Sequence, residues 1–227
     1  MSAELDTALT SAQATDVQAQ SRSAGQFMLI YWGISAVLGL IFLRDWLTSW
    51  NVAATFANPG LVALLLVSLI CGQGLYFAVA RHGGRPIHWG PTWVFAIGNG
   101  VFETLAFALV YRLGEVIGNS IASAFAPSLY ALGFTIGLSL FTIYGGLIHA
   151  LFWLHILPPH LDDSPRSRRI RKVRPVGEIL LVLGWSLCLW LNQDIWTIIF
   201  FHIIVDFGLM LLVRPPVFSA EPTPATQ

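Results

Sequence analysis

Residues 92–112 read TWVFAIGNGVFETLAFALVYR, and this stretch decides the fold class. A helix needs about 20 mainly apolar residues to cross the ~30 Å hydrocarbon core of a membrane. Five further apolar segments of comparable length lie elsewhere in the chain, at 27–47, 61–80, 129–157, 176–191 and 195–213. We therefore predict an all-α protein, a polytopic integral membrane bundle of about six transmembrane helices.

The composition of the whole chain agrees with this prediction. Of the 227 residues 56% are apolar and 11% are charged, and the mean hydropathy is +0.69. Soluble domains average about 25% charged residues, so soluble enzyme classes are excluded. Twelve basic residues balance twelve acidic ones, and no net field attracts nucleic acid. Cys71 and Cys188 lie in or next to apolar segments, which argues against a disulfide framework or a Cys-rich zinc site.

The apolar segments define three regions of the chain. Residues 1–25 are rich in Ser, Ala, Gln and Thr, and we expect a disordered N-terminal tail. Residues 26–214 form one transmembrane domain. Residues 215–227 begin with two prolines and are expected to form a disordered C-terminal tail. Within the domain, the stretch 114–128 is too polar and too short to span, so we expect it to lie at the interface or to re-enter the membrane.

The distribution of Arg and Lys predicts the orientation in the membrane. With six spans and the N-terminus inside, both termini are cytoplasmic. The outer face then has only Arg44 and Arg112, whereas ten basic residues gather on the inner face, as the positive-inside rule requires: Arg22, Arg81, Arg85, Arg166, Arg168, Arg169, Arg171, Lys172, Arg174 and Arg214. We expect a multi-pass protein of the plasma membrane or of an internal membrane of the thylakoid type, in contact with lipid.

Three ionisable side chains inside the apolar segments stand out. Counted at 1.5 Å per residue from the cytoplasmic ends, Glu103, His149 and His202 lie at depths of about 16, 12 and 16 Å. Asp206 follows His202 by four residues and Asn99 precedes Glu103 by four, so each pair shares a helix face. Because such residues are costly in hydrocarbon, they mark functional sites by default. The alternative is a structural polar cluster that locks the helices.

The order of these residues resembles the CPBP family of CAAX-prenyl-protease-like intramembrane proteins. That family carries Glu-Glu-x-x-x-Arg, then Phe-x-x-x-His, then His-x-x-x-Asn or Asp. The corresponding stretches here are Glu103 to Ala108, Gly145 to His149 and His202 to Asp206, within a core of about 92–213. This chain departs from the pattern in three places, where Thr104, Ala108 and Gly145 replace the second glutamate, the arginine and the phenylalanine.

The resemblance implies an endopeptidase that hydrolyses peptide bonds at the membrane, with a membrane protein or a prenylated protein as substrate. In this hypothesis Glu103 takes a proton from water, and His149 positions that water. His202, oriented by Asp206, stabilises the developing oxyanion. The ligand types also permit a zinc ion held by His149, His202 and Glu103, with water in the fourth place.

Two alternatives remain open from the sequence. The first is a non-catalytic membrane factor of the same fold, which binds a partner helix, an isoprenoid lipid or a pigment in the polar centre of the bundle. The second is a transporter in which the carboxyl and imidazole groups relay protons. An intact first motif would favour the protease, and the replacements at Thr104 and Ala108 favour the non-catalytic factor.

Overall fold

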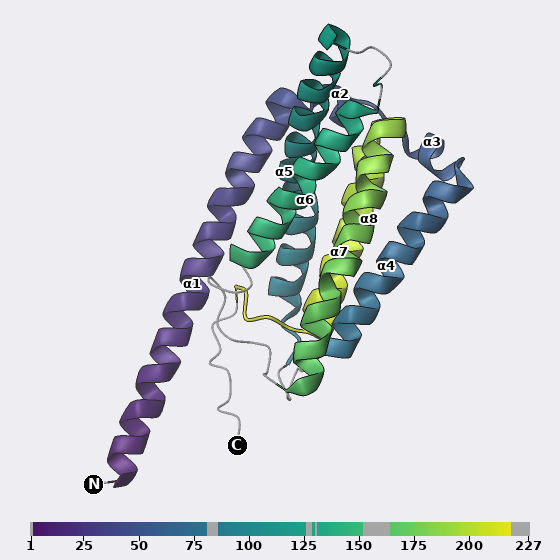
Figure 1. Ribbon diagram of the computed structural model, residues 1–227. Coiled ribbons are helices and arrows are strands. Elements are labelled where there is room, and N and C mark those ends of the chain that lie inside the picture. The colour runs from purple at the N-terminus through teal and green to yellow at the C-terminus, as the bar shows by residue number, and fades with distance from the viewer. Residues whose placement is uncertain (1, 81–85, 126–128, 130, 152–163, 219–227) are drawn as a thin grey trace.

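The computed structural model describes residues 2–80, 86–125, 129, 131–151 and 164–218 (Figure 1). These residues form helices joined by short connections. In chain order the helices are α1 (Ser2–Phe42), α2 (Arg44–Thr48), α3 (Val52–Phe56), α4 (Pro59–Val79), α5 (Trp89–Phe125), α6 (Leu132–Leu151), α7 (Pro165–Asn192) and α8 (Ile195–Leu212).

Six of these helices contain segments long and apolar enough to cross a membrane. Large apolar side chains such as Ile30, Ile70 and Leu147 point outwards, where lipid contacts them. The all-α fold with six spans is confirmed, and the chain is a multi-pass integral membrane protein. The segments are Ala19–Phe42, Pro59–Ala78, Trp89–Phe125, Leu132–Leu151, Lys172–Asn192 and Ile195–Leu212.

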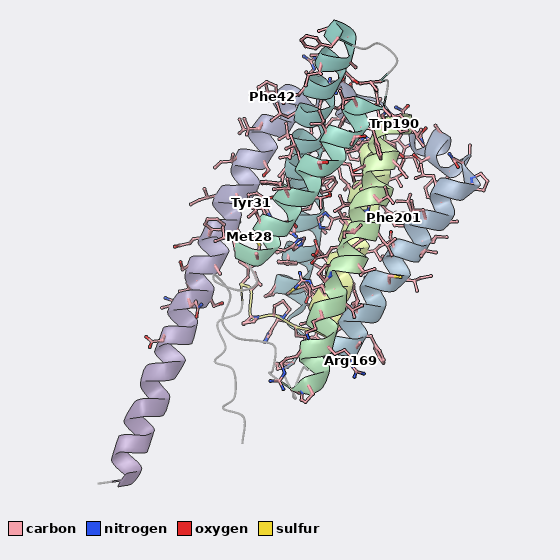
Figure 2. All side chains as sticks on the ribbon, viewed as in Figure 1. Met28, Tyr31, Phe42, Arg169, Trp190 and Phe201 are labelled. Carbon is pink, nitrogen blue, oxygen red and sulfur yellow. The ribbon has the colours of Figure 1, made fainter. Side chains whose placement is uncertain are left out.

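The helix α5 forms the centre of the bundle. It packs against α1, α6 and α8, while α4 packs against α7 and α8. Figure 1 shows the long helices side by side, with α1 starting and α8 ending at the same end of the bundle, as an even number of spans requires. Arg169 lies at that end (Figure 2). Arg81 and Arg85 lie outside the described residues, and the cytoplasmic orientation stays a prediction.

The structure corrects the prediction for the stretch 114–128. The expected position of residues 114–125 at the membrane interface stays a prediction, but these residues do not re-enter as a separate segment and instead continue α5, which runs unbroken to Phe125. The reason is close packing of glycines between α5 and α6. A Cβ at Gly114 would lie 2.7 Å from the Gly137 Cα, and one at Gly118 would lie 2.7 Å from the Gly133 Cα. Without side chains at these positions the backbones of α5 and α6 approach closely, and this packing stabilises the C-terminal part of α5.

The structure describes parts of both predicted tails, and the expectation that they are disordered stays a prediction. The helix α1 begins at Ser2, so residues 2–25 are helical, in keeping with the high helix propensity of their Ala, Leu, Glu and Gln residues. After α8, the segment 214–218 turns back onto α1. The Ser21 hydroxyl donates to the Pro216 carbonyl at 2.7 Å, Val217 is fully buried, and the Phe218 ring lies 5.8 Å from the Trp32 ring. Residues 219–227 lie outside the described residues.

A buried polar clasp joins α3 to the α7–α8 connection. Its centre is Asp194, which is 1% exposed and caps α8 by accepting from the Thr197 amide at 3.1 Å. The other carboxylate oxygen accepts from the Thr197 hydroxyl at 2.5 Å and from the Thr55 hydroxyl at 2.6 Å. The Cys188 thiol donates to the Asp194 carbonyl, and the Asn192 amide donates to Thr55. The clasp satisfies a buried carboxylate with neutral donors alone.

Candidate functional site

Three of the four residues predicted as catalytic meet between α5 and α8. Glu103, His202 and Asp206 are 5%, 4% and 4% exposed, and one ligand atom of each lies within 4.8 Å of the others. The His202 Nε2 atom lies 3.5 Å from Glu103 Oε2 and 3.3 Å from Asp206 Oδ2. We call these three residues the acid–imidazole cluster. Their distances are those of ion pairs, so any charge on one group is felt strongly by the other two in this low dielectric.

The amide of Asn99 connects the two carboxyl groups of this cluster. Its Nδ2 atom donates to Glu103 Oε2 at 2.5 Å and to Asp206 Oδ2 at 3.0 Å. Its Oδ1 atom accepts from the indole N–H of Trp32 at 3.2 Å. Asn99 therefore uses both of its donor hydrogens on carboxyl oxygens and has an indole donor on its oxygen.

Thr104, the departure from the family's second glutamate, contacts His202 directly. Its hydroxyl lies 2.6 Å from the Gly100 carbonyl and 2.9 Å from His202 Nδ1. A hydroxyl has one hydrogen, and the carbonyl can only accept it, so Nδ1–H must donate to the Thr104 oxygen. The proton on Nδ1 leaves Nε2 to face the carboxyl groups. Thr104 thus selects the ring nitrogen that faces Glu103 and Asp206.

The close approach of α5 and α8 at this level depends on a glycine. A Cβ at Gly100 would lie 2.8 Å from the backbone nitrogen of Ile203, so a side chain there would force the helices apart. The His202 ring then fits between two aromatic rings. Phe107 is nearly parallel to it at 6.0 Å between centroids, and Trp185 is tilted at 4.8 Å. These contacts fix the imidazole in place.

A cavity of about 380 Å³ lies beside the cluster and is lined by residues of α4, α5, α6, α7 and α8. Its walls are mostly apolar, and a smaller number of polar side chains also line it. His202 and Asp206 form part of the wall at the cluster, and His149, Arg174 and Glu178 line it as well. Arg174 and Glu178 form an ion pair of 2.6 Å on α7. The cavity has the size and lining of a ligand site.

A second, smaller cavity of about 40 Å³ lies on the α1 side of the cluster. Its polar lining includes Tyr31, Asn99, Glu103, His149 and Asp206. Such a volume exceeds the ~10–15 Å³ that one water molecule requires, and these groups supply several hydrogen-bond partners. Glu103 lines this cavity, whereas Asp206 lines both. The two cavities share Tyr76, His149, Asp206 and Leu209 as lining residues, so the large, mostly apolar cavity adjoins the small polar one beside the cluster.

His149, the fourth predicted residue, lies beside both cavities but outside the acid–imidazole cluster. It lines both cavities, and its ring centroid lies 6.4 Å from that of Phe107. The group of ligand atoms close enough to share a metal ion consists of Glu103, His202 and Asp206 and does not include His149. The geometry thus brings together a different trio from the one considered for zinc. Because Asn99 donates to the two carboxyl oxygens of that trio, the arrangement is satisfied by hydrogen bonds.

Sequence reasoning missed two contributors to the site, Thr104 and Trp32. Thr104 counted only as a missing glutamate, and Trp32 is separated from Asn99 by 67 positions. Serine and threonine hydroxyls in a span usually bond to the carbonyl four residues earlier, so nothing in the sequence singles out Thr104. Asn99 carried a signal, since it is an amide four residues before a buried carboxyl on the same helix face.

The comparisons with known proteins give no relative. No protein-family profile, no curated protein and no solved structure matches this chain. The resemblance to the CPBP family rests on the motif residues alone.

Proposed function

We propose that this protein is a CPBP-like intramembrane endopeptidase that hydrolyses peptide bonds at the acid–imidazole cluster. The observation that carries the proposal is the convergence of Glu103, His202 and Asp206 from two helices inside the membrane domain. His202 and Asp206 line a ligand-sized cavity, and Glu103 lines the small polar cavity on the other side. Costly ionisable groups that meet beside a cavity are typical of catalytic sites.

The reaction follows from the two cavities. A water molecule in the small cavity gives a proton to the Glu103 carboxylate as its oxygen attacks the peptide carbonyl carbon. The proton then passes to the leaving nitrogen as the C–N bond breaks, which yields a carboxylic acid and an amine. His202 carries a proton on Nδ1, and with a second proton on Nε2 it is an imidazolium whose Nε2–H stabilises the developing oxyanion, while His149 helps to position the water.

The large cavity supplies the place for the substrate. Its lining comes from both α6 and α7, and these helices diverge toward the end of the bundle where α1 starts (Figure 1). Gly146 on α6 borders this space with no atom within 4 Å of a Cβ added there. An apolar chain can therefore enter sideways from the membrane with its peptide bond directed at His202 and Asp206.

The experiment that tests the proposal replaces Glu103 by Gln, which keeps size and removes the acid–base function. The probe is an internally quenched farnesylated peptide, incubated with the purified protein in liposomes. Wild type should cleave it, and Glu103→Gln should lose turnover by about 100-fold or more. Glu115→Gln, on the same helix but away from the cluster, is the matched control and should keep full activity. Equal turnover in both variants would refute the proposal.

A second candidate, a non-catalytic lipid- or pigment-binding factor, is favoured by the lining of the large cavity. Apolar side chains such as Leu75, Phe141 and Val182 supply most of its wall. In this case Glu103→Gln should have a mild effect, because Gln still donates and accepts hydrogen bonds. Gly146→Leu would fill the cavity, and mass spectrometry of lipids or pigments that copurify with the protein should show the ligand lost.

A further inference from the structure

We infer that Trp32 and Asn99 are positioning residues of the acid–imidazole cluster, through which α1 sets the hydrogen-bonded state of Glu103 and Asp206. The kinetic part of this inference rests on the proposed function, whereas the structural part does not. Neither residue belongs to the motif pattern that suggested the function. Both act through other groups rather than on the substrate.

The hydrogen bonds fix the Asn99 amide in one orientation. The indole N–H of Trp32 is only a donor, so the Asn99 atom that faces it must be the oxygen. The NH₂ group then faces Glu103 and Asp206. A flipped amide would place its oxygen against two carboxyl oxygens and its NH₂ group against the indole N–H. Both contacts would be repulsive, which leaves a single arrangement.

This orientation has a consequence for the protons of the cluster. Two carboxylates this close in low dielectric repel each other, which favours a proton on one of them. Asn99 gives each carboxylate an N–H donor, and such bonds stabilise the ionised form. His202 carries a proton on Nδ1, and a second proton on Nε2, which faces both carboxylates, makes the ring a cation that also stabilises their ionised forms. Asn99 therefore favours a Glu103 that holds no proton and is ready to accept one from water.

The Trp32 side chain is buried and tightly packed, so its indole N–H holds the Asn99 amide in one position. It is 5% exposed and packs against Phe102 at 6.0 Å and Phe218 at 5.8 Å between ring centroids. The neighbouring Gly98 makes room for the indole, because any side chain there would collide with the ring. In the sequence Gly98-Asn99-Gly100, the first glycine leaves room for the Trp32 ring and Asn99 donates to both carboxyl groups. The second glycine allows the close packing of α8 against α5.

The test uses Trp32→Phe, which keeps an aromatic ring and removes the N–H donor together with part of the indole ring. Trp196→Phe is the matched control, since Trp196 also donates one indole hydrogen bond, to the Leu47 carbonyl at 3.2 Å, far from the cluster. On the quenched peptide, Trp32→Phe should lower kcat by about 10- to 100-fold, the range that a misplaced catalytic group costs, with KM unchanged. Trp196→Phe should leave both constants unchanged.

Infrared spectroscopy at neutral pH provides a second readout that requires no activity. Trp32→Phe and Asn99→Leu should each gain the C=O stretch of a protonated carboxyl group, and Trp196→Phe should not. If neither variant gains this band, the inference is overturned even where Glu103→Gln has abolished turnover. If wild type cleaves no peptide but both variants gain the band, the positioning role stands and the proposed function falls. Should Trp32→Phe not fold, Asn99→Leu decides the infrared result alone.

Discussion

Asp194 and Asp206 are two buried carboxylates of the same helix region, the first at the N-cap of α8 and the second within α8, and they have different surroundings. Asp194 begins α8 in the polar clasp, where hydroxyl and amide donors satisfy it. Asp206 lies in the C-terminal half of α8, beside a second carboxyl, an imidazole and two cavities. The comparison shows that burial of a carboxylate does not indicate function. What indicates function is the presence of ionisable neighbours and a cavity beside the carboxylate.

The largest expected difference comes from replacing each aspartate by asparagine. Asp206→Asn should reduce peptide turnover by about 100-fold or more, because His202 loses an ionised partner, with little change in thermal stability. Asp194→Asn should lower the free energy of unfolding by about 1–3 kcal/mol, because its new NH₂ group faces donors. Turnover per folded molecule should stay normal. Thermal unfolding and turnover measured on the same samples check both. A stability loss in Asp206→Asn as large as that in Asp194→Asn would mean that the acid–imidazole cluster has a structural role, like the clasp.

The threonines that contact these two regions offer a finer comparison. Thr104→Val removes the acceptor for His202 Nδ1–H, so the ring loses its fixed tautomer, and turnover should fall by about 10- to 100-fold. Thr197→Val removes one hydroxyl donor from Asp194 and should cost about 1 kcal/mol of stability without a kinetic effect. Nitrogen-15 NMR of the His202 ring, which separates the two tautomers, should change only in Thr104→Val. An unchanged tautomer would show that Thr104 does not select it.

The smallest expected effect lies at the edge of the clasp. Cys188→Ala removes a weak S–H···O bond to the Asp194 carbonyl and a few buried atoms. We expect a loss of about 1 kcal/mol, within the range for a single hydrogen bond, and unchanged turnover. Chemical denaturation in detergent measures it. A loss as large as that of Asp194→Asn would mean that the thiol, rather than the carboxylate, holds the clasp together.

The sequence predicted the six apolar helices because span length and hydropathy depend only on local composition. It also predicted that costly groups on different helices lie at one level, and Glu103 and His202 do meet. The depth argument works because antiparallel helices share one hydrocarbon thickness. It could not predict rotation about the helix axes, and this is why it placed His149 and not Asp206 in the trio considered for a metal ion.

The remaining errors have a common physical origin in long-range packing. Residues 114–125 look too polar and too short to span a membrane, yet they continue α5, where Gly118 closely approaches Gly133 on α6. Thr104 and His202 are 98 positions apart, and Trp32 and Asn99 are 67 positions apart. Such pairs are set by how the helices assemble, and no local pattern within a single chain reveals them.

The contact between Ser21 and Pro216 joins residues 195 positions apart, close to the two ends of the chain. During biosynthesis the first span enters the membrane long before the segment after α8 leaves the ribosome. Phe218, which packs on Trp32, is therefore among the last described residues to be made. The packing around Trp32 is complete only once the segment after α8 has been made, so a nascent chain or one truncated after α8 carries the cluster residues without their complete support.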